Sequence, residues 1–313
     1  MSDEQTRAAL LRASKPPTRE FFASLIAANH ILHHHNVLGA DGHVSVRNPQ
    51  DRETFFISKS LPSALVSSRE DIQEYKVSDA SPTANDAETG YEELRIHSEI
   101  YKKYEQVMSV IYSRSEAVIP FSIGSIPLRP ATSTGSMIGP QVPCFDASLH
   151  YKSSDPKSMQ VAYEHLGQAL AAGFSPSNVF SKTTSLIKNF VTSAAPDPTP
   201  YPSSSTVLMR GIGFSCVGHD LYEAVYRAIS ICANARTQTT ALLMQGTFNI
   251  GLLGERFGAG EKENGPAKQE NIRYLSDKEV QDAAAARTQS IERAWQLWCA
   301  EVANSNLYTN EMK

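Results

Sequence analysis

The spacing of apolar residues along the chain predicts a mixture of helices and strands. In residues 20–36 the apolar side chains recur three and four residues apart, which places them on one face of a helix. Short runs at 43–46, 55–58 and 107–112 are typical of strands. Asp220, with Glu223 three residues later, opens a long helix. Its apolar stripe comprises Leu221, Val225, Ala228, Ile229 and Cys232.

One main domain with an addition at each end is the predicted organisation. The three parts are a polar lead at 1–17, the main domain at 18–255 and a C-terminal helical extension at 256–313. Within the main domain, an insertion at 174–205 contains the proline-rich stretch 196–202. Proline-rich segments of this kind form loops, so we expect a surface excursion or a lid over a pocket.

The C-terminal extension is predicted to be helical after a break. A charged, glycine-rich segment at 258–265 interrupts the helical pattern. Beyond it, residues 277–302 predict a final helix or helix pair that presents Trp295, Leu297 and Trp298.

Composition adds limits on partners and location. The 313 residues are 41% hydrophobic and carry a net charge of −4, which suits an enzyme-sized body without a general attraction for nucleic acid or anionic membrane. No run of 18 apolar residues and no signal peptide pattern is present, so we expect no membrane partner. The four cysteines lack a C-x-x-C spacing, and we expect reduced thiols and a cytoplasmic location.

Four segments, in order, resemble the motifs of the class II aldolase/adducin superfamily. Residues 42–47, Gly-His-Val-Ser-Val-Arg, resemble its G-[NH]-V-S-x-R turn, and residues 56–60 resemble its second I-S/T loop. Residues 93–101 match its E-x-x-x-H-x-x-x-Y helix start, and residues 208–213 match its strand end R-G-H-G. The connecting segments at 115–121 and 126–130 resemble those of the aromatic-acid decarboxylase branch.

The resemblance implies both a fold and an assembly. The fold is α/β, a three-layer α/β/α sandwich around a mixed central sheet. Members of this superfamily often form ring-like tetramers with active sites at subunit interfaces, so we expect a homo-oligomer. The helix that carries Trp295 and Trp298 either contributes to such an interface or packs on its own subunit.

The metal site of the superfamily is replaced in this chain. In active members, histidines of an H-x-H pair and of R-G-H-G bind a divalent metal, usually zinc, which stabilises an enolate. Here Tyr112 and Arg114 stand at the H-x-H positions, Ile212 stands in R-G-H-G, and a further histidine of the decarboxylase-like branch falls near Ser133. Arginine has no lone pair to offer, and an alkyl group has none either. We therefore expect no metal and no other cofactor.

Two other features limit the ligand. His33, His34 and His35 are consecutive, and helical side chains about 100° apart do not converge on one ion. Tyr91 and Glu92 stand where the superfamily carries two small hydroxyl residues that grip a phosphate, and a carboxylate repels phosphate. A phosphorylated sugar is therefore not the expected substrate.

Glu93 is the first of the candidate catalytic residues. The resemblance gives it the role of a general acid/base that moves a proton next to a carbonyl, and without a metal, burial would raise its pKa. As an alternative, it caps the N–H groups of its helix. Tyr112 and Arg114 are the other candidate catalytic residues, for a developing oxyanion. The candidate substrate-binding residues are His43, Lys59, Ser133, Arg210 and Ile212.

Three functional hypotheses follow for a small-molecule substrate. The first, slightly preferred, is a metal-independent cyclase or pericyclase of the Diels-Alder type in secondary metabolism, because Ile212 makes the former metal pocket less polar. The second is a metal-free decarboxylase, retro-aldol lyase or isomerase that uses Glu93 for the proton. The third is a non-catalytic protein that binds a metabolite or a partner.

Overall fold

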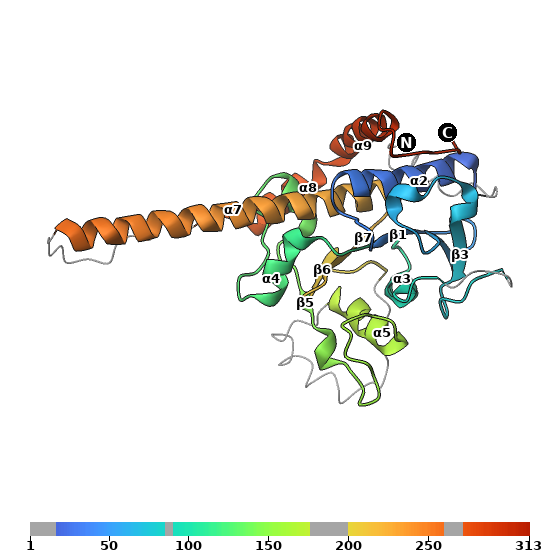
Figure 1. Ribbon diagram of the computed structural model, residues 1–313, viewed down its shortest axis with the longest axis horizontal. Coiled ribbons are helices and arrows are strands. Elements are labelled where there is room, and N and C mark those ends of the chain that lie inside the picture. The colour runs from blue at the N-terminus through green and yellow to red at the C-terminus, as the bar shows by residue number, and fades with distance from the viewer. Residues whose placement is uncertain (1–16, 85–89, 176–199, 260–271) are drawn as a thin grey trace.

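A seven-stranded mixed sheet forms the centre of the protein in the computed structural model, which describes residues 17–84, 90–175, 200–259 and 272–313 (Figure 1). The strands are β1 His43–Arg47, β2 Thr54–Ser58, β3 Ile72–Lys76, β4 Ser109–Ser113, β5 Cys144–Phe145, β6 Thr206–Met209 and β7 Gly213–Gly218. Their order across the sheet is β3-β2-β1-β4-β7-β6-β5. β5 pairs with β6 in parallel, and the other pairs are antiparallel.

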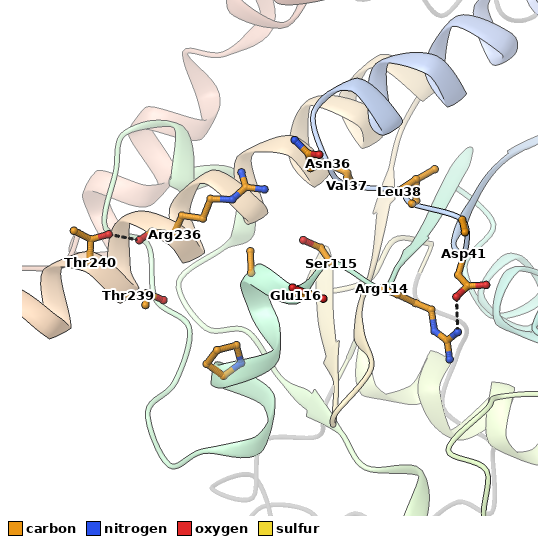
Figure 2. Close-up of a pocket in the computed structure, with 14 residues that line it drawn as sticks. Asn36, Val37, Leu38, Asp41, Arg114, Ser115, Glu116, Arg236, Thr239 and Thr240 are labelled. Atoms are coloured by element: carbon orange, nitrogen blue, oxygen red, sulfur yellow. Dashed lines mark hydrogen bonds and ion pairs between the residues drawn. The ribbon is translucent and has the colours of Figure 1, made fainter. Parts of the chain in front are cut away.

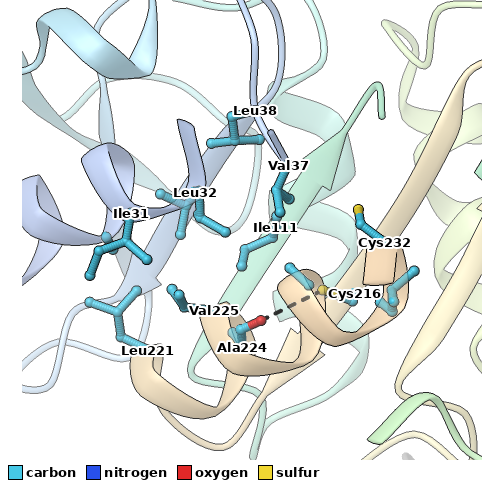
Figure 3. Packing of buried hydrophobic residues seen from close by; sticks show 14 of the residues in the cluster. Ile31, Leu32, Val37, Leu38, Ile111, Cys216, Leu221, Ala224, Val225 and Cys232 are labelled. Atoms are coloured by element: carbon cyan, nitrogen blue, oxygen red, sulfur yellow. Dashed lines mark hydrogen bonds between the residues drawn. The ribbon is translucent and has the colours of Figure 1, made fainter. Parts of the chain in front are cut away.

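Helices cover both faces of this sheet. The described helices are α2 Arg19–His34, α3 Leu94–Lys103, α4 Ile119–Ile123, α5 Glu164–Gly173, α7 Leu221–Ala259, α8 Asp277–Ala285 and α9 Thr288–Ala303. Because side chains alternate along a strand, successive strand residues belong to different cores. Ile111 packs with α2 and α7 on one face, as Figure 3 shows, whereas Val110 and Tyr112 pack with α3 and α5 on the other. The three-layer α/β/α fold is confirmed.

The predicted elements correspond closely to those observed. The expected helix at 20–36 is α2, and the expected strands at 43–46, 55–58 and 107–112 are β1, β2 and β4. The long helix is α7, and its start is capped because Asp220 Oδ1 accepts a hydrogen bond from the Glu223 backbone N–H at 2.8 Å.

The C-terminal extension is a helix pair, α8 and α9, but its predicted start lies inside a helix. α7 is continuous through Ala259 and therefore runs past the boundary placed at 255/256. Trp295 makes an edge contact with Tyr222 at a ring distance of 4.4 Å, and Trp298 makes one with His35 at 5.1 Å. These two indoles therefore pack on their own subunit.

Some sequence-based predictions fall on other parts of the chain. The lead at 1–16, most of the insertion, at 176–199, and residues 260–271 lie outside the described residues, and the predicted lid lies there too. Cys216 and Cys232 are buried free thiols, as expected, whereas Cys144 is exposed. None of the described helices combines the length and apolar character that a membrane span requires.

Candidate functional site

A buried polar network joins β1 to α3. His43 and Ser45 are two residues apart on β1, so both side chains point to the α3 face of the sheet. His97 and Tyr101 are four residues apart on α3 and share one helix face. His43 Nδ1 lies 2.7 Å from His97 Nε2, Ser45 Oγ lies 2.6 Å from His97 Nδ1, and Ser45 Oγ lies 2.7 Å from the Tyr101 hydroxyl.

Both histidines of this network are neutral. Burial lowers the pKa of His43 to about 3, and the nearby positive charge of Arg114 adds to the effect. Burial also lowers the pKa of His97 well below its usual value, with His43 as the second cause. Each ring therefore carries one N–H and one lone pair near neutral pH.

The network ends in a pocket of about 480 Å³ at the start of β1. Its wall contains His43, Glu93, Tyr112 and Arg114, and the remaining lining residues are Ala40, Asp41, Gly42, Ser60, Leu61, Pro62, Gly90, Tyr91, Glu92 and Gln160. His43 is 1% exposed, and its Nε2 has no hydrogen-bond partner among the residues that the structure describes. A buried polar atom without a partner at a pocket wall is suited to bind a ligand.

Backbone geometry brings this pocket wall together. His43 pairs with Tyr112 across β1 and β4, so their rings lie 5.1 Å apart. Gly42 has a φ of +90°, and an added Cβ would lie 2.8 Å from the Tyr112 carbonyl oxygen. The glycine is therefore required where the chain enters β1 beside β4.

Glu93 occupies the N-cap position of α3 but does not cap it. Its side chain makes no capping hydrogen bond. Burial raises the pKa of Glu93, while a hydrogen bond to its own backbone and, after it, the positive charge of Arg114 act in the opposite direction. The capping alternative is thus not what the structure shows, and the carboxyl group is placed at the pocket with an increased tendency to hold a proton.

Tyr112 and Arg114 supply a hydroxyl group and a positive charge. Burial, and then the negative charge of Glu93, raise the pKa of Tyr112, so the phenol stays protonated. Arg114 Nη1 donates to Asp41 Oδ2 at 2.9 Å. The Arg114 side chain is 39% exposed and that of Asp41 66%, so solvent screens this ion pair and it contributes at most about 1 kcal/mol. Arg114 is therefore available to a ligand anion at small cost.

The Arg114–Asp41 pair also borders a second, larger cavity. This cavity has a volume of about 830 Å³ and includes Asn36, Glu116, Arg236 and Thr240 in its lining. Figure 2 shows the pair at one side of it and Arg236 of α7 at another. Because Ala40, Asp41 and Arg114 line both spaces, the two pockets adjoin at the ion pair.

The other predicted binding residues are not among those that line the Glu93 pocket in the described chain. Lys59 lies in the loop after β2, where its backbone carbonyl accepts the Tyr91 hydroxyl at 2.7 Å. Arg210 pairs with Asp146 at 2.7 Å, and Ser133 is exposed and accepts a hydrogen bond from Arg287. Ile212 is a buried member of the core on the α3 face.

The ligand positions of the superfamily do not fit a metal ion here. The phenol of Tyr112 is protonated, Arg114 has no lone pair, and Ile212 is apolar. Within the described ranges, no group of three or more His, Cys, Asp and Glu side chains is arranged to hold a metal. This applies to His33, His34 and His35 too, of which His33 contacts Tyr308 at 2.9 Å.

Four residues of the site were not among the candidates predicted from the sequence: Ser45, His97, Tyr101 and Tyr91. Ser45 belongs to the G-[NH]-V-S-x-R motif, and His97 and Tyr101 belong to the E-x-x-x-H-x-x-x-Y motif, four and eight residues after Glu93, so these two motifs were the available signal. Tyr91 was interpreted only as a lost phosphate contact. Its ring lies 4.2 Å from that of His43, and its hydroxyl group holds the 59–61 loop at the Lys59 and Leu61 carbonyls.

The sheet order, the flanking helices and the pocket at the start of β1 define a class II aldolase-like protein. The chain belongs to this family, because the model for the class II aldolase and adducin N-terminal domain matches residues 23–239. Over 294 residues it is 37% identical to the decarboxylase tropJ of Talaromyces stipitatus, a match that covers 94% of this chain and 97% of that protein.

Solved structures agree with this fold. L-fuculose 1-phosphate aldolase from Glaciozyma antarctica superposes with a TM-score of 0.59 at 14% identity and covers 94% of this chain and 95% of its own. An aldolase II superfamily protein from Pseudomonas syringae gives a TM-score of 0.59 at 14% identity, with coverage of 94% and 96%. At these identities the likeness concerns the fold alone.

Proposed function

We propose that this protein is a decarboxylase that acts without a metal ion on a small organic acid whose carboxylated carbon is conjugated to a carbonyl or phenol oxygen. The observation that carries the proposal is the pocket that Glu93 lines together with Arg114, Tyr112 and His43. Burial raises the pKa of Glu93, and its side chain makes no capping hydrogen bond. The similarity to a fungal decarboxylase over nearly the whole chain supports the same reaction class.

The reaction needs one proton and a place for one electron pair. When the bond from carbon to the carboxylate breaks, CO₂ leaves and the electron pair moves through the conjugated system to the oxygen. Arg114 and Tyr112 stabilise the resulting oxyanion by charge and hydrogen bonding. Glu93 gives its proton to that carbon, before CO₂ leaves when the carbon belongs to a phenolate ring and afterwards when it lies next to a carbonyl, and Glu93 regains a proton from water. The net change is loss of CO₂ and uptake of one proton.

Cyclisation is the less supported alternative. The sequence favoured it because Ile212 would make the pocket apolar, but Ile212 is not among the described lining residues of the Glu93 pocket. That lining contains Asp41, Glu92 and Gln160 besides the proposed catalytic groups. Such a polar wall suits a substrate with hydrogen-bonding oxygens better than an apolar hydrocarbon.

Turnover of carboxyl-¹³C-labelled hydroxybenzoates, with ¹³CO₂ as the readout, tests the proposal. We expect release from at least one ortho-hydroxylated acid and a loss of about 10²–10⁴-fold in kcat in Glu93→Gln. Glu70→Gln changes an exposed glutamate outside the pocket and is the matched control. Binding of these acids, detected by thermal shift, without any ¹³CO₂ would favour a non-catalytic binding protein.

We propose in addition that the protein forms a homo-oligomer, a tetramer by resemblance. α7 extends well beyond the sheet in Figure 1, and Leu243, Met244 and Phe248 on it are each more than half exposed. Large apolar side chains gathered on one helix are typical of a surface that another chain covers. Sedimentation equilibrium of the full chain and of Leu243→Glu measures the assembly. A monomer in the wild type would refute this proposal.

A further inference from the structure

The hydrogen bonds of the buried network behind the pocket run in one direction, from donor to acceptor. Tyr101 is 1% exposed, and burial raises its pKa, so its hydroxyl group keeps its proton. Ser45 Oγ, at 2.7 Å, is the one hydrogen-bond acceptor that the described residues offer to this proton. A buried O–H group without an acceptor is unfavourable, so Tyr101 donates to Ser45.

The donor of this first hydrogen bond determines the donors of the other two. Because Ser45 Oγ accepts from Tyr101, its own proton goes to its other neighbour, His97 Nδ1, at 2.6 Å. A neutral imidazole that accepts at Nδ1 carries its proton on Nε2. His97 Nε2–H therefore donates across 2.7 Å to His43 Nδ1, and the proton of His43 is left on Nε2. In the reverse direction the Tyr101 proton would have no acceptor.

We infer that Tyr101, Ser45 and His97 hold His43 as its Nε2–H tautomer and make it a hydrogen-bond donor to an oxygen of the bound substrate. His43 Nε2 is buried, lines the pocket and has no other partner in the described chain. The inference rests on the proposed function and names one more group for its oxyanion. His43 contacts the substrate, whereas His97, Ser45 and Tyr101 are positioning residues that act through it.

A neutral donor at this position selects a class of ligand oxygen. An N–H group binds a carbonyl, a phenolate or a carboxylate oxygen but offers no lone pair to a hydroxyl proton. Together with Arg114 and the protonated Tyr112, it gives the pocket three donors for one or two acceptor oxygens. An acid with a carbonyl or phenolate oxygen next to the carboxylate meets this pattern, and a neutral polyol does not.

Nuclear magnetic resonance of the ¹⁵N-histidine-labelled full chain at pH 7.5 tests the tautomer directly, because protonated and unprotonated ring nitrogens differ in chemical shift. The His43 signals are assigned from their loss in His43→Asn. We expect Nε2 protonated and Nδ1 unprotonated, and we expect salicylate to shift the Nε2 signal while Nδ1 stays unprotonated. A proton on Nδ1, or a Nε2 signal that no salicylate concentration moves, would overturn the inference.

Two variants separate positioning from mere packing. Ser45→Ala removes the one hydrogen-bonded link that the described residues provide between Tyr101 and His97, and we expect the Nδ1–H form of His43 to appear beside the Nε2–H form. Tyr101→Phe removes the donor that sets the direction but leaves Ser45 in contact with His97, so we expect the Nδ1–H form there as well, in a smaller fraction than in Ser45→Ala. A wild-type tautomer in both variants would contradict the proposed direction. Nε2–H with a salicylate response, but without ¹³CO₂ release, would refute the decarboxylase proposal alone.

Discussion

The neutrality of His43 has a measurable consequence for the stability of the protein in acid. An unfolded histidine has a pKa of about 6.5, whereas burial in the folded protein lowers that of His43 to about 3. Between these values the unfolded chain takes up a proton that the folded chain does not. The free energy of unfolding therefore falls as pH falls from about 6.5 toward 3.

The size of this effect follows from the two pKa values. pH 5 lies about 1.5 units below the pKa of an unfolded histidine and above that of folded His43. At about 1.4 kcal/mol per unit, protonation of His43 in the unfolded chain lowers the free energy of unfolding by about 2 kcal/mol. His97, and His30 with a pKa of about 4, act in the same direction. Urea unfolding at pH 7.5 and pH 5.0 measures the loss in the wild type and in His43→Asn.

The comparison of the variants isolates His43. We expect the difference between the two pH values to be about 2 kcal/mol smaller in His43→Asn, with the dependence on urea concentration unchanged. His150→Asn removes one exposed imidazole and is the matched control. Equal losses in wild type and His43→Asn would show that His43 is protonated in the folded state, and the reasoning about the network would be refuted.

Three further predictions concern the pocket. The activity should fall as pH rises through the raised pKa of Glu93, because its acid form donates the proton; a rate that keeps rising with pH would argue for a Glu93 base instead. Tyr112→Phe should lower kcat by about 10-fold or more through loss of one oxyanion donor, whereas an unchanged kcat would remove Tyr112 from the mechanism. Gly42→Ala should destabilise the fold by about 1–3 kcal/mol, measured by urea unfolding, because alanine is strained at a φ of +90° and meets the Tyr112 carbonyl; an unchanged midpoint would contradict this.

The sheet was predictable from the sequence because each of its main strands has a visible apolar pattern. β1, β2 and β4 lie within a residue or two of the expected ranges, since their side chains alternate between the two cores. The end of α7 was not predictable in the same way. Gly258 was interpreted as the start of a break, but a helix tolerates an isolated glycine at a cost of about 1 kcal/mol, and α7 continues through Ala259.

The site was predictable only in part. Glu93, Tyr112, Arg114 and His43 line one pocket. Two of the motifs pointed to His43 and Glu93, and the H-x-H positions of the superfamily pointed to Tyr112 and Arg114. Ser133 and Arg210 were placed by their order in the chain, which does not tell which side chains will lie next to them in the folded protein. In the structure, those partners are Arg287 for Ser133 and Asp146 for Arg210. Arg287 belongs to the C-terminal extension, whose packing no local pattern reveals.

The direction of the buried network could not be read from the sequence, although its members could. Two side chains at alternate positions of a strand and two at a four-residue helical spacing are visible in residues 42–47 and 93–101. Whether β1 lies beneath α3 depends on long-range packing. The order of donors depends on what surrounds Tyr101, which only the folded structure defines.

One measurement tests most directly whether the protein's own side chains carry out the reaction. Untagged protein is passed over chelating resin, and its metal content and its rate of ¹³CO₂ release from the best hydroxybenzoate are measured on the same sample. Tyr112, Arg114 and Ile212 at the former ligand positions predict full turnover at close to zero metal ions per chain. Turnover that disappears with the metal and returns when Zn²⁺ is added would contradict the account.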